Sequence, residues 1–162
     1  MSAVVPLRSR ARRAPARGEN SPARSYGFAW DDGSGQAYNQ EAFRYFLDIE
    51  RRRSQVSARP FLLLLVGLRR VTGQAEWRVR SAVAGKLFSA LRLSLRETDF
   101  IGWYREGRLT GAVLTHCGDL SDAEISRQAR DRVIRAMAER LPKDIVDRLH
   151  VRVCRVPSIN RS

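Results

Sequence analysis

The spacing of apolar residues predicts a leading helix and then a buried strand. The helix should run from about Asn39 to Arg53, because asparagine is a residue type that caps helix N-termini. Its apolar face, at the i, i+3, i+4 spacing of a helix, consists of Phe43, Phe46 and Leu47. The next segment, FLLLLVGL at residues 61–68, is apolar without interruption, which is typical of a strand covered on both faces.

A second helix is predicted from about Ala75 to Leu95, because an apolar residue returns every four positions there. These residues are Val79, Val83, Leu87, Leu91 and Leu95. Two β-prone runs follow at residues 100–104 and 109–115. The short turn between them contains Gly107, so the two runs predict a β-hairpin.

Ser121 and Glu124 have the S-x-x-E spacing of a capping box, in which each side chain satisfies a backbone N–H at the start of a helix. They predict a third helix that ends before Pro142. Its apolar stripe consists of Ile125, Val133, Met137 and Leu141. The last segment, LHVRVCRV at residues 149–156, alternates apolar residues with arginine as an edge strand does.

After the leading N-terminal helix, the predicted order of elements is β-α-β-β-α-β. This order is typical of the ferredoxin-like α+β fold, or palm core, which has an antiparallel sheet with two helices on one face. The fold serves many functions, so the chemistry has to be inferred from a site.

The 162 residues divide into a tail and one domain. Residues 1–25 are rich in arginine, alanine, proline and serine with almost nothing to bury, which predicts a disordered basic tail. Residues 26–162 are expected to form the domain. Because 43% of the chain is hydrophobic, it can build a core of its own.

The net charge of +13 raises the question of a nucleic-acid partner. Only Lys86 and Lys143 of the 30 basic residues are lysines, and such use of arginine can reflect genomic base composition as easily as phosphate contacts. The charge therefore favours a solvated basic surface over nucleic-acid binding. Peripheral contact of the tail with an anionic membrane remains an alternative.

A cytoplasmic protein without a metal or other cofactor is expected. No apolar run reaches the roughly 20 residues of a membrane span, and the N-terminus lacks the apolar segment of a secretory signal. Two cysteines, Cys117 and Cys154, do not indicate a disulfide framework. Together with His116 and His150 they match no zinc spacing, since His116 and Cys117 are adjacent and would point to opposite faces of a strand.

The segment LRETDFIGWYREGRLTGAVL, residues 95–114, resembles the signature hairpin of bacterial diguanylate cyclases, the GGDEF domains. In that family an R-x-x-D pair precedes the GGDEF turn by the interval that separates Arg96 and Asp99 from Arg105. An earlier segment, DGSGQAYNQEAF at residues 32–43, is similar to the opening D-x-L-T-G-L-x-N-R-x-x-F of the family. The resemblance covers about residues 30–156 and rests on the order and spacing of these motifs.

The same resemblance implies that the domain is not an enzyme. Diguanylate cyclases join two GTP molecules and need carboxylates to hold Mg²⁺ ions. Val66 and Leu68 stand where the two aspartates of the family's strand would be, and Gly107 and Arg108 stand at the acidic residues of the turn. Because an arginine repels a divalent cation, catalysis is not expected.

The R-x-x-D pair implies the inhibitory site of the family, which binds the product cyclic di-GMP. Arginine can donate two hydrogen bonds to a phosphate or to guanine, and aspartate can accept from the Watson–Crick edge of guanine. One turn of helix would put Arg96 and Asp99 on the same side, although the same spacing also suits an ordinary surface ion pair. Arg127 or Arg130 could complete the site, as an arginine from a nearby helix or a second protomer often does in the family.

Three functional hypotheses follow. The first is an inactive GGDEF-like regulatory domain that binds cyclic di-GMP through Arg96 and Asp99 and signals as a homodimer or to a protein partner. The second is a dimerisation or docking scaffold that needs no nucleotide. The third is binding to nucleic acid or an anionic membrane through the basic tail.

Overall fold

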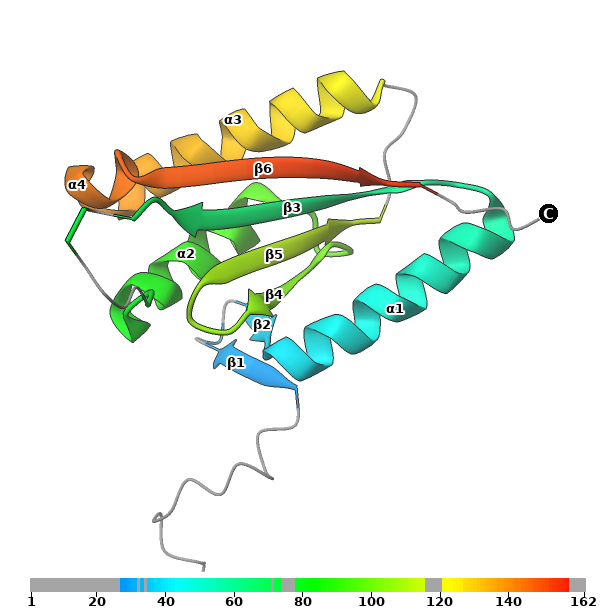
Figure 1. Ribbon diagram of the computed structural model, residues 1–162, viewed down its shortest axis with the longest axis horizontal. Helices are drawn as coiled ribbons and strands as arrows, with labels where there is room; N and C mark the ends of the chain where they lie inside the picture. Colours follow the sequence, from blue (N-terminus) through cyan, green and yellow to red (C-terminus); the bar gives the residue numbers. More distant parts are fainter. Residues whose placement is uncertain are drawn as a thin grey trace, which may run out of the picture.

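The fold is seen in a computed structural model, whose elements lie around one six-stranded sheet (Figure 1). The residues that it describes are 27–31, 33, 35–70, 72–73, 78–115 and 121–157. The predicted disordered tail, residues 1–25, lies outside them. No helix in this described part of the chain is long and apolar enough to cross a membrane.

The predicted β-α-β-β-α-β order is confirmed. Its elements are β3 (Phe61–Leu68), α2 (Ser81–Ser94), β4 (Phe100–Arg105), β5 (Leu109–Leu114), α3 (Asp122–Arg140) and β6 (Leu149–Val156). These four strands pair antiparallel in the order β4-β5-β3-β6, with β6 at the edge. Both α2 and α3 cover one face of the sheet, which is the ferredoxin-like arrangement.

Strand β3 is apolar throughout because both of its faces are covered. Leu62, Leu64 and Val66 pack in the larger core, beneath α2 and α3. Phe61 and Leu63 belong to a smaller core on the opposite face, beneath α1. Side chains alternate between the two faces of a strand, so every position of a strand between two cores faces apolar surroundings.

Helix α1 (Gln40–Ser57) is the predicted leading helix, and it is four residues longer than expected. The Asn39 cap is confirmed, because its side-chain Oδ1 accepts a hydrogen bond of 2.9 Å from the Ala42 amide. The helix ends at Ala58, whose φ of 54° is left-handed. The charged residues near Arg53 therefore lie on the helix surface and do not end it.

Two short strands were not predicted, β1 (Phe28–Asp31) and β2 (Gln36–Tyr38). They form a hairpin, and β2 then joins the edge of β4 in parallel, with Tyr38 opposite Gly102. The sheet is therefore not wholly antiparallel. Gly102 permits this approach, because a Cβ atom there would lie only 2.5 Å from the carbonyl oxygen of Tyr38.

The boundaries of the other helices correct the sequence-based expectation. Helix α2 starts at Ser81 instead of near Ala75, and residues 74–77 lie outside the described part. Val79 is buried ahead of the helix. The capping box of Ser121 and Glu124 is confirmed at the start of α3, and a short helix, α4 (Lys143–Val146), follows Pro142.

Candidate ligand-binding site

The Arg96–Asp99 segment forms a turn between α2 and β4 and is not the last turn of the helix. Helix α2 ends at Ser94, and the Asp99 amide donates to the Arg96 carbonyl oxygen at 3.0 Å. Strand β4 then begins at Phe100. The side chains of Arg96 and Asp99 therefore come from a tight turn, in which Arg96 is exposed and Asp99 is buried.

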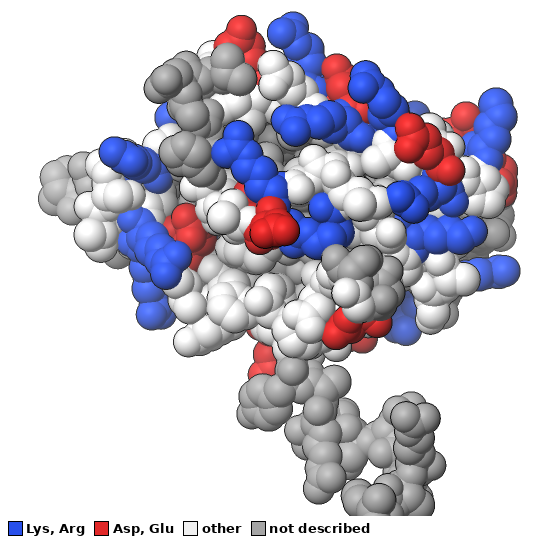
Figure 2. Space-filling view, turned by 180° about the vertical axis from the view of Figure 1, so that it is seen from behind, with Lys and Arg blue, Asp and Glu red and all other residues white. Residues whose placement is uncertain are grey.

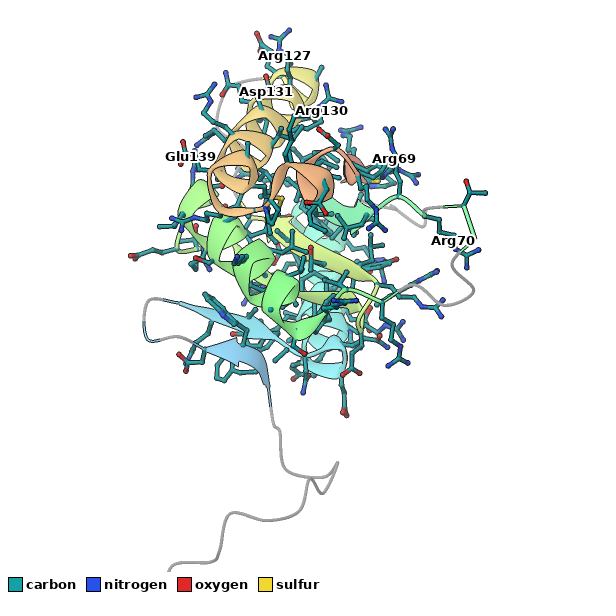
Figure 3. The ribbon with its side chains drawn as sticks, turned by 90° about the vertical axis from the view of Figure 1, so that its left-hand side faces the viewer. Arg69, Arg70, Arg127, Arg130, Asp131 and Glu139 are labelled. Atoms are coloured by element: carbon teal, nitrogen blue, oxygen red, sulfur yellow. The ribbon has the colours of Figure 1, made fainter. Side chains whose placement is uncertain are left out.

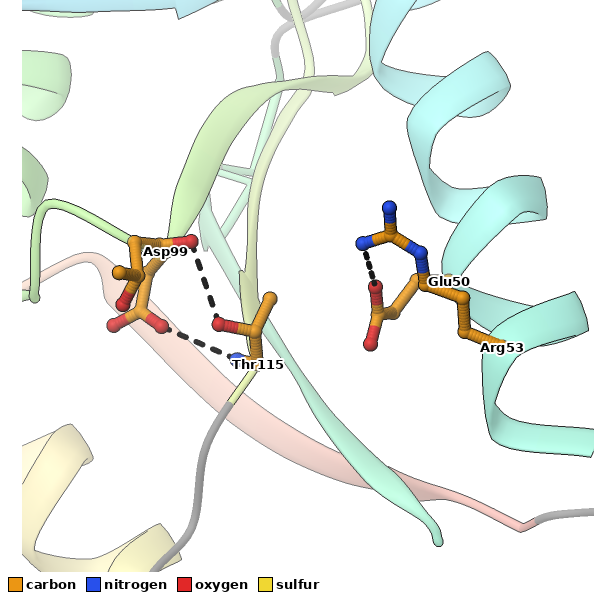
Figure 4. A network of polar contacts seen from close by, with 5 residues as sticks. Glu50, Arg53, Asp99 and Thr115 are labelled. Atoms are coloured by element: carbon orange, nitrogen blue, oxygen red, sulfur yellow. Dashed lines mark hydrogen bonds and ion pairs between the residues drawn. The ribbon is translucent and has the colours of Figure 1, made fainter. Parts of the chain in front are cut away.

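The Asp99 carboxylate accepts two backbone amides, and Figure 4 shows the one that comes from Thr115. Its Oδ2 accepts from the Arg96 amide at 3.0 Å, and its Oδ1 accepts from the Thr115 amide at 3.2 Å. The Thr115 hydroxyl also donates to the Thr98 carbonyl oxygen at 3.3 Å. With only 5% of its surface exposed, Asp99 joins the start of β4 to the end of β5. Its carboxylate is thus a structural acceptor for two backbone N–H groups.

Arg92 is a further polar residue of this turn that the sequence pattern did not single out. Its guanidinium donates to the Asp99 carbonyl oxygen at 3.0 Å and also to the Arg96 carbonyl oxygen. These carbonyl groups lie just beyond the C-terminus of α2, where a cation is favoured by the helix dipole. The turn is therefore fixed by the Asp99 carboxylate, which accepts the amides of Arg96 and Thr115, and by the Arg92 guanidinium, which binds its carbonyl groups.

Arg127 and Arg130 lie on α3 and are exposed, and both project outward from the helix (Figure 3). Thr115 contacts Asp99, and only five residues separate Thr115 from the Ser121 cap of α3. The first turns of α3 therefore lie at the same end of the sheet as the Arg96–Asp99 turn (Figure 1). Among the described residues, neither arginine hydrogen bonds to the Asp99 carboxylate, which is held by the two amides.

The tip of the β4–β5 hairpin lies at the other end of β4. Gly107 has a φ of 70°, a left-handed conformation that favours glycine over the acidic residue of the family motif. The Val79 amide donates to the Gly107 carbonyl oxygen at 2.7 Å. From the opposite side, the Gln40 side chain accepts from the Glu106 amide at 2.6 Å. Chain segments on both sides thus hold the tip in place.

Beneath this tip, the end of β3 presents apolar side chains to the core. Val66 and Leu68 are 1% and 8% exposed and pack in the larger core with Val79. The buried hydroxyl of Thr110 donates to the Val66 carbonyl oxygen at 3.1 Å, so the backbone here is satisfied within the sheet. The two positions that the family resemblance assigns to aspartates are therefore occupied by closely packed apolar side chains, which exclude water.

Of the four candidate metal ligands, His150 and Cys154 lie on β6, whereas His116 and Cys117 lie outside the described residues. Strand β3 separates β6 from β5, as the predicted fold requires. Within the described part of the chain, histidine, cysteine and acidic side chains form no group of three or more that could hold a metal ion.

The surface around α2 and α3 carries many basic side chains, interspersed with acidic ones (Figure 2). The neighbours of one acidic residue, Glu124, change its pKa. The Ser121 hydroxyl and amide donate to its carboxylate, which lowers the pKa of Glu124, and the positive charge of Arg127 acts in the same direction. This network orders the first turn of α3, and Arg127 stands on the next turn.

Comparison of the fold with solved structures identifies its class. The GGDEF domain of FimX from Pseudomonas aeruginosa matches with a TM-score of 0.56 and 15% identity, over 81% of this chain and 82% of that one. The GGDEF domain of TpbB (YfiN) from the same organism matches with a TM-score of 0.55 and 19% identity, over 78% and 75% of the two chains. The fold is that of a GGDEF domain.

A DGC protein from Thermotoga maritima also matches this GGDEF-like domain, with a TM-score of 0.50 and 13% identity over 76% of this chain and 83% of that one. No protein-family model matches the sequence, and no curated protein matches it either. At such identities the likeness is one of fold. The function of the GGDEF-like domain has to be argued from its own residues.

Proposed function

We propose that the chain is a catalytically inactive GGDEF-like regulatory domain, which binds cyclic di-GMP beside the Arg96–Asp99 turn and signals as a homodimer or to a protein partner. The observation that carries the proposal is the burial of Val66 and Leu68 in the apolar core at the end of β3. Metal-assisted phosphoryl transfer needs carboxylates there, and apolar side chains can bind neither Mg²⁺ nor a triphosphate.

The opposite end of β4 supports the ligand-binding part of the proposal. An exposed arginine, Arg96, follows a helix and sits on a turn that Asp99 and Arg92 fix through four hydrogen bonds. Arg127 and Arg130 add exposed guanidinium groups on the first half of α3, the helix that starts at the same end of the sheet (Figure 1). Arginine matches the geometry of phosphate and of guanine O6 and N7, which are the groups that cyclic di-GMP presents.

In this proposal Asp99 acts by positioning the turn. Its two carboxylate oxygens already accept backbone amides, so a guanine would have to compete with those bonds. Ordering Arg96 in advance would reduce the conformational entropy lost on binding. Arg96 and the arginines of α3 would then make the contacts with the ligand.

The same bonds favour a second candidate, a docking or dimerisation domain that needs no nucleotide. A turn whose polar groups are satisfied internally is stable without a ligand, and Asp99 would then serve the fold alone. The two candidates differ in whether Arg96 has a ligand.

Calorimetric titration of the purified chain with cyclic di-GMP tests the proposal. Binding is expected below about 100 μM, and Arg96→Ala should weaken it by roughly 1.5 to 3 kcal/mol, or about 10- to 150-fold. Arg96→Lys should restore little, because a point charge cannot reproduce bidentate geometry. Arg127→Ala and Arg130→Ala should each weaken binding, whereas Arg140→Ala at the far end of α3 is the matched control.

Absence of binding at about 100 μM ligand would reject the receptor proposal in favour of the docking candidate. Binding that Arg96→Ala leaves unchanged would show that the ligand uses a different surface. An equal loss of affinity in Arg96→Ala and Arg140→Ala would indicate unspecific attraction to a basic protein.

A further inference from the structure

A hollow lies between the β1–β2 hairpin, the C-terminal end of α2 and the start of β4. Its volume is about 760 Å³, within the range of sites that hold drug-sized ligands. The unpredicted strands β1 and β2, which contribute to its lining, lie at the lower edge of the sheet in Figure 1. The hollow adjoins the Arg96–Asp99 turn of the cyclic di-GMP proposal, but the arginines that would contact that ligand, Arg96, Arg127 and Arg130, are not among its lining residues.

Four elements contribute aromatic rings to one wall of the hollow. Phe28 of β1 stacks on Tyr38 of β2, with ring centroids 5.2 Å apart and planes at 22°. Tyr38 contacts Phe46 of α1 at 4.7 Å, and Phe46 lies 5.9 Å from Phe100 of β4. Phe28 is 41% exposed, so the row of rings is open to a ligand at its outer end.

The charged residues that line this hollow are mainly acidic, in a chain whose net charge is +13. Asp31 and Glu97 contribute carboxylates and Arg92 contributes one guanidinium, whereas the carboxylate of the third acidic residue, Asp99, is buried and held by two backbone amides. That guanidinium donates to the carbonyl oxygens of the Arg96–Asp99 turn. Glu97 is exposed at the same turn, so its carboxylate is accessible to a cation.

The walls of the hollow are ordered without a ligand. Asp31 accepts hydrogen bonds of 2.9 Å from the Gly33 amide and from the Gln36 side chain. Gly35 lies directly over Arg92, because a Cβ atom at this glycine would be 2.5 Å from Cγ of Arg92. The aromatic wall and the acidic residues are therefore held in a fixed relation.

We infer that this hollow binds an arginine side chain of an extended basic peptide from a partner protein. A guanidinium is attracted to the faces of aromatic rings and can also donate to carboxylates, and the hollow offers both types of group side by side. Its open shape suits a side chain with its flanking backbone. Inside the hollow the carboxylates of Asp31 and Glu97 disfavour phosphate groups, which distinguishes it from the arginines proposed to contact cyclic di-GMP.

Titration of the full chain with three blocked pentapeptides, followed by amide chemical shifts, tests the inference. The central residue is arginine, its neutral analogue citrulline, or glutamate, and glycine flanks it on both sides. The arginine peptide should bind and shift the amides of Phe28, Tyr38 and Glu97. The citrulline peptide should bind about 10-fold more weakly, and the glutamate peptide should not bind.

Two substitutions locate the site. Glu97→Gln should weaken the arginine peptide about 5-fold and Phe28→Leu about 3-fold, while Glu139→Gln on α3 should have no effect. Equal binding of the arginine and citrulline peptides would overturn the inference, as would equal affinities of Glu97→Gln and Glu139→Gln. Because no nucleotide is present in the titration, this result is independent of the outcome with cyclic di-GMP.

Discussion

The two ends of strand β4 differ in the kind of side chain that is buried there. At its start, the Asp99 carboxylate is buried and accepts two backbone amides. Near its end, under the hairpin tip, Val66 and Leu68 fill the places that the GGDEF resemblance assigns to carboxylates. A buried carboxylate is therefore stable in this domain where backbone N–H groups donate hydrogen bonds to it. A cyclase would need a metal ion to satisfy the same groups at the other end.

The largest effect is expected when a carboxylate is placed at the apolar end. Val66→Asp should destabilise the domain by about 4 kcal/mol, because it buries a charge without a partner. Urea denaturation measures the loss, with Val66→Ala as a control that only opens a cavity. Arg108→Glu, on the exposed turn, should change the free energy of unfolding by less than about 0.5 kcal/mol. A Val66→Asp variant as stable as the wild type would show that water or a partner group reaches position 66.

The next effect is expected at the polar end. Asp99→Ala should lower the free energy of unfolding by about 3 kcal/mol, since the amides of Arg96 and Thr115 would lose their acceptor. Asp99→Asn should lose less, because one amide oxygen can still accept. The control is Glu97→Ala, which removes an exposed carboxylate two residues away. If Asp99→Ala and Glu97→Ala change the free energy of unfolding by the same amount, Asp99 has no structural role.

The smallest effect is expected at the start of α3. Ser121→Ala should lower the Tm by about 3 °C, because it removes the helix cap. The Ser121 bonds lower the pKa of Glu124, so their contribution is present at neutral pH and is lost as the pH falls through that lowered value. The difference in Tm between wild type and Ser121→Ala should therefore shrink in acid. A difference that grows in acid would contradict this sign.

The elements that the sequence predicted correctly are those specified by local patterns. The uninterrupted apolar run predicted β3, the turn with Gly107 predicted the β4–β5 hairpin, and the S-x-x-E spacing predicted the start of α3. Strands β1 and β2 have four and three residues and show no alternation that could predict them. They form because β2 can approach Gly102 closely, which is a contact over a long sequence separation.

The candidate site could be predicted only in part, for a similar reason. Its residue types and its position before β4 follow from the sequence, but the burial of Asp99 depends on Thr115, which the hairpin brings back to the turn. Arg92 could have been noticed as a cation in the last turn of a helix. The acidic, aromatic hollow could not be predicted, because its walls come from five separate elements, β1, β2, α1, α2 and β4.

Incubation of the purified chain with GTP and either Mg²⁺ or Mn²⁺, followed by detection of cyclic di-GMP, tests the central claim most directly. The burial of Val66 and Leu68 leads to the prediction that product stays at the level of a control without protein. An active diguanylate cyclase in parallel shows that the assay detects turnover. Product above the control would contradict the account, because it would require a metal site at the end of β4 that the described residues do not provide.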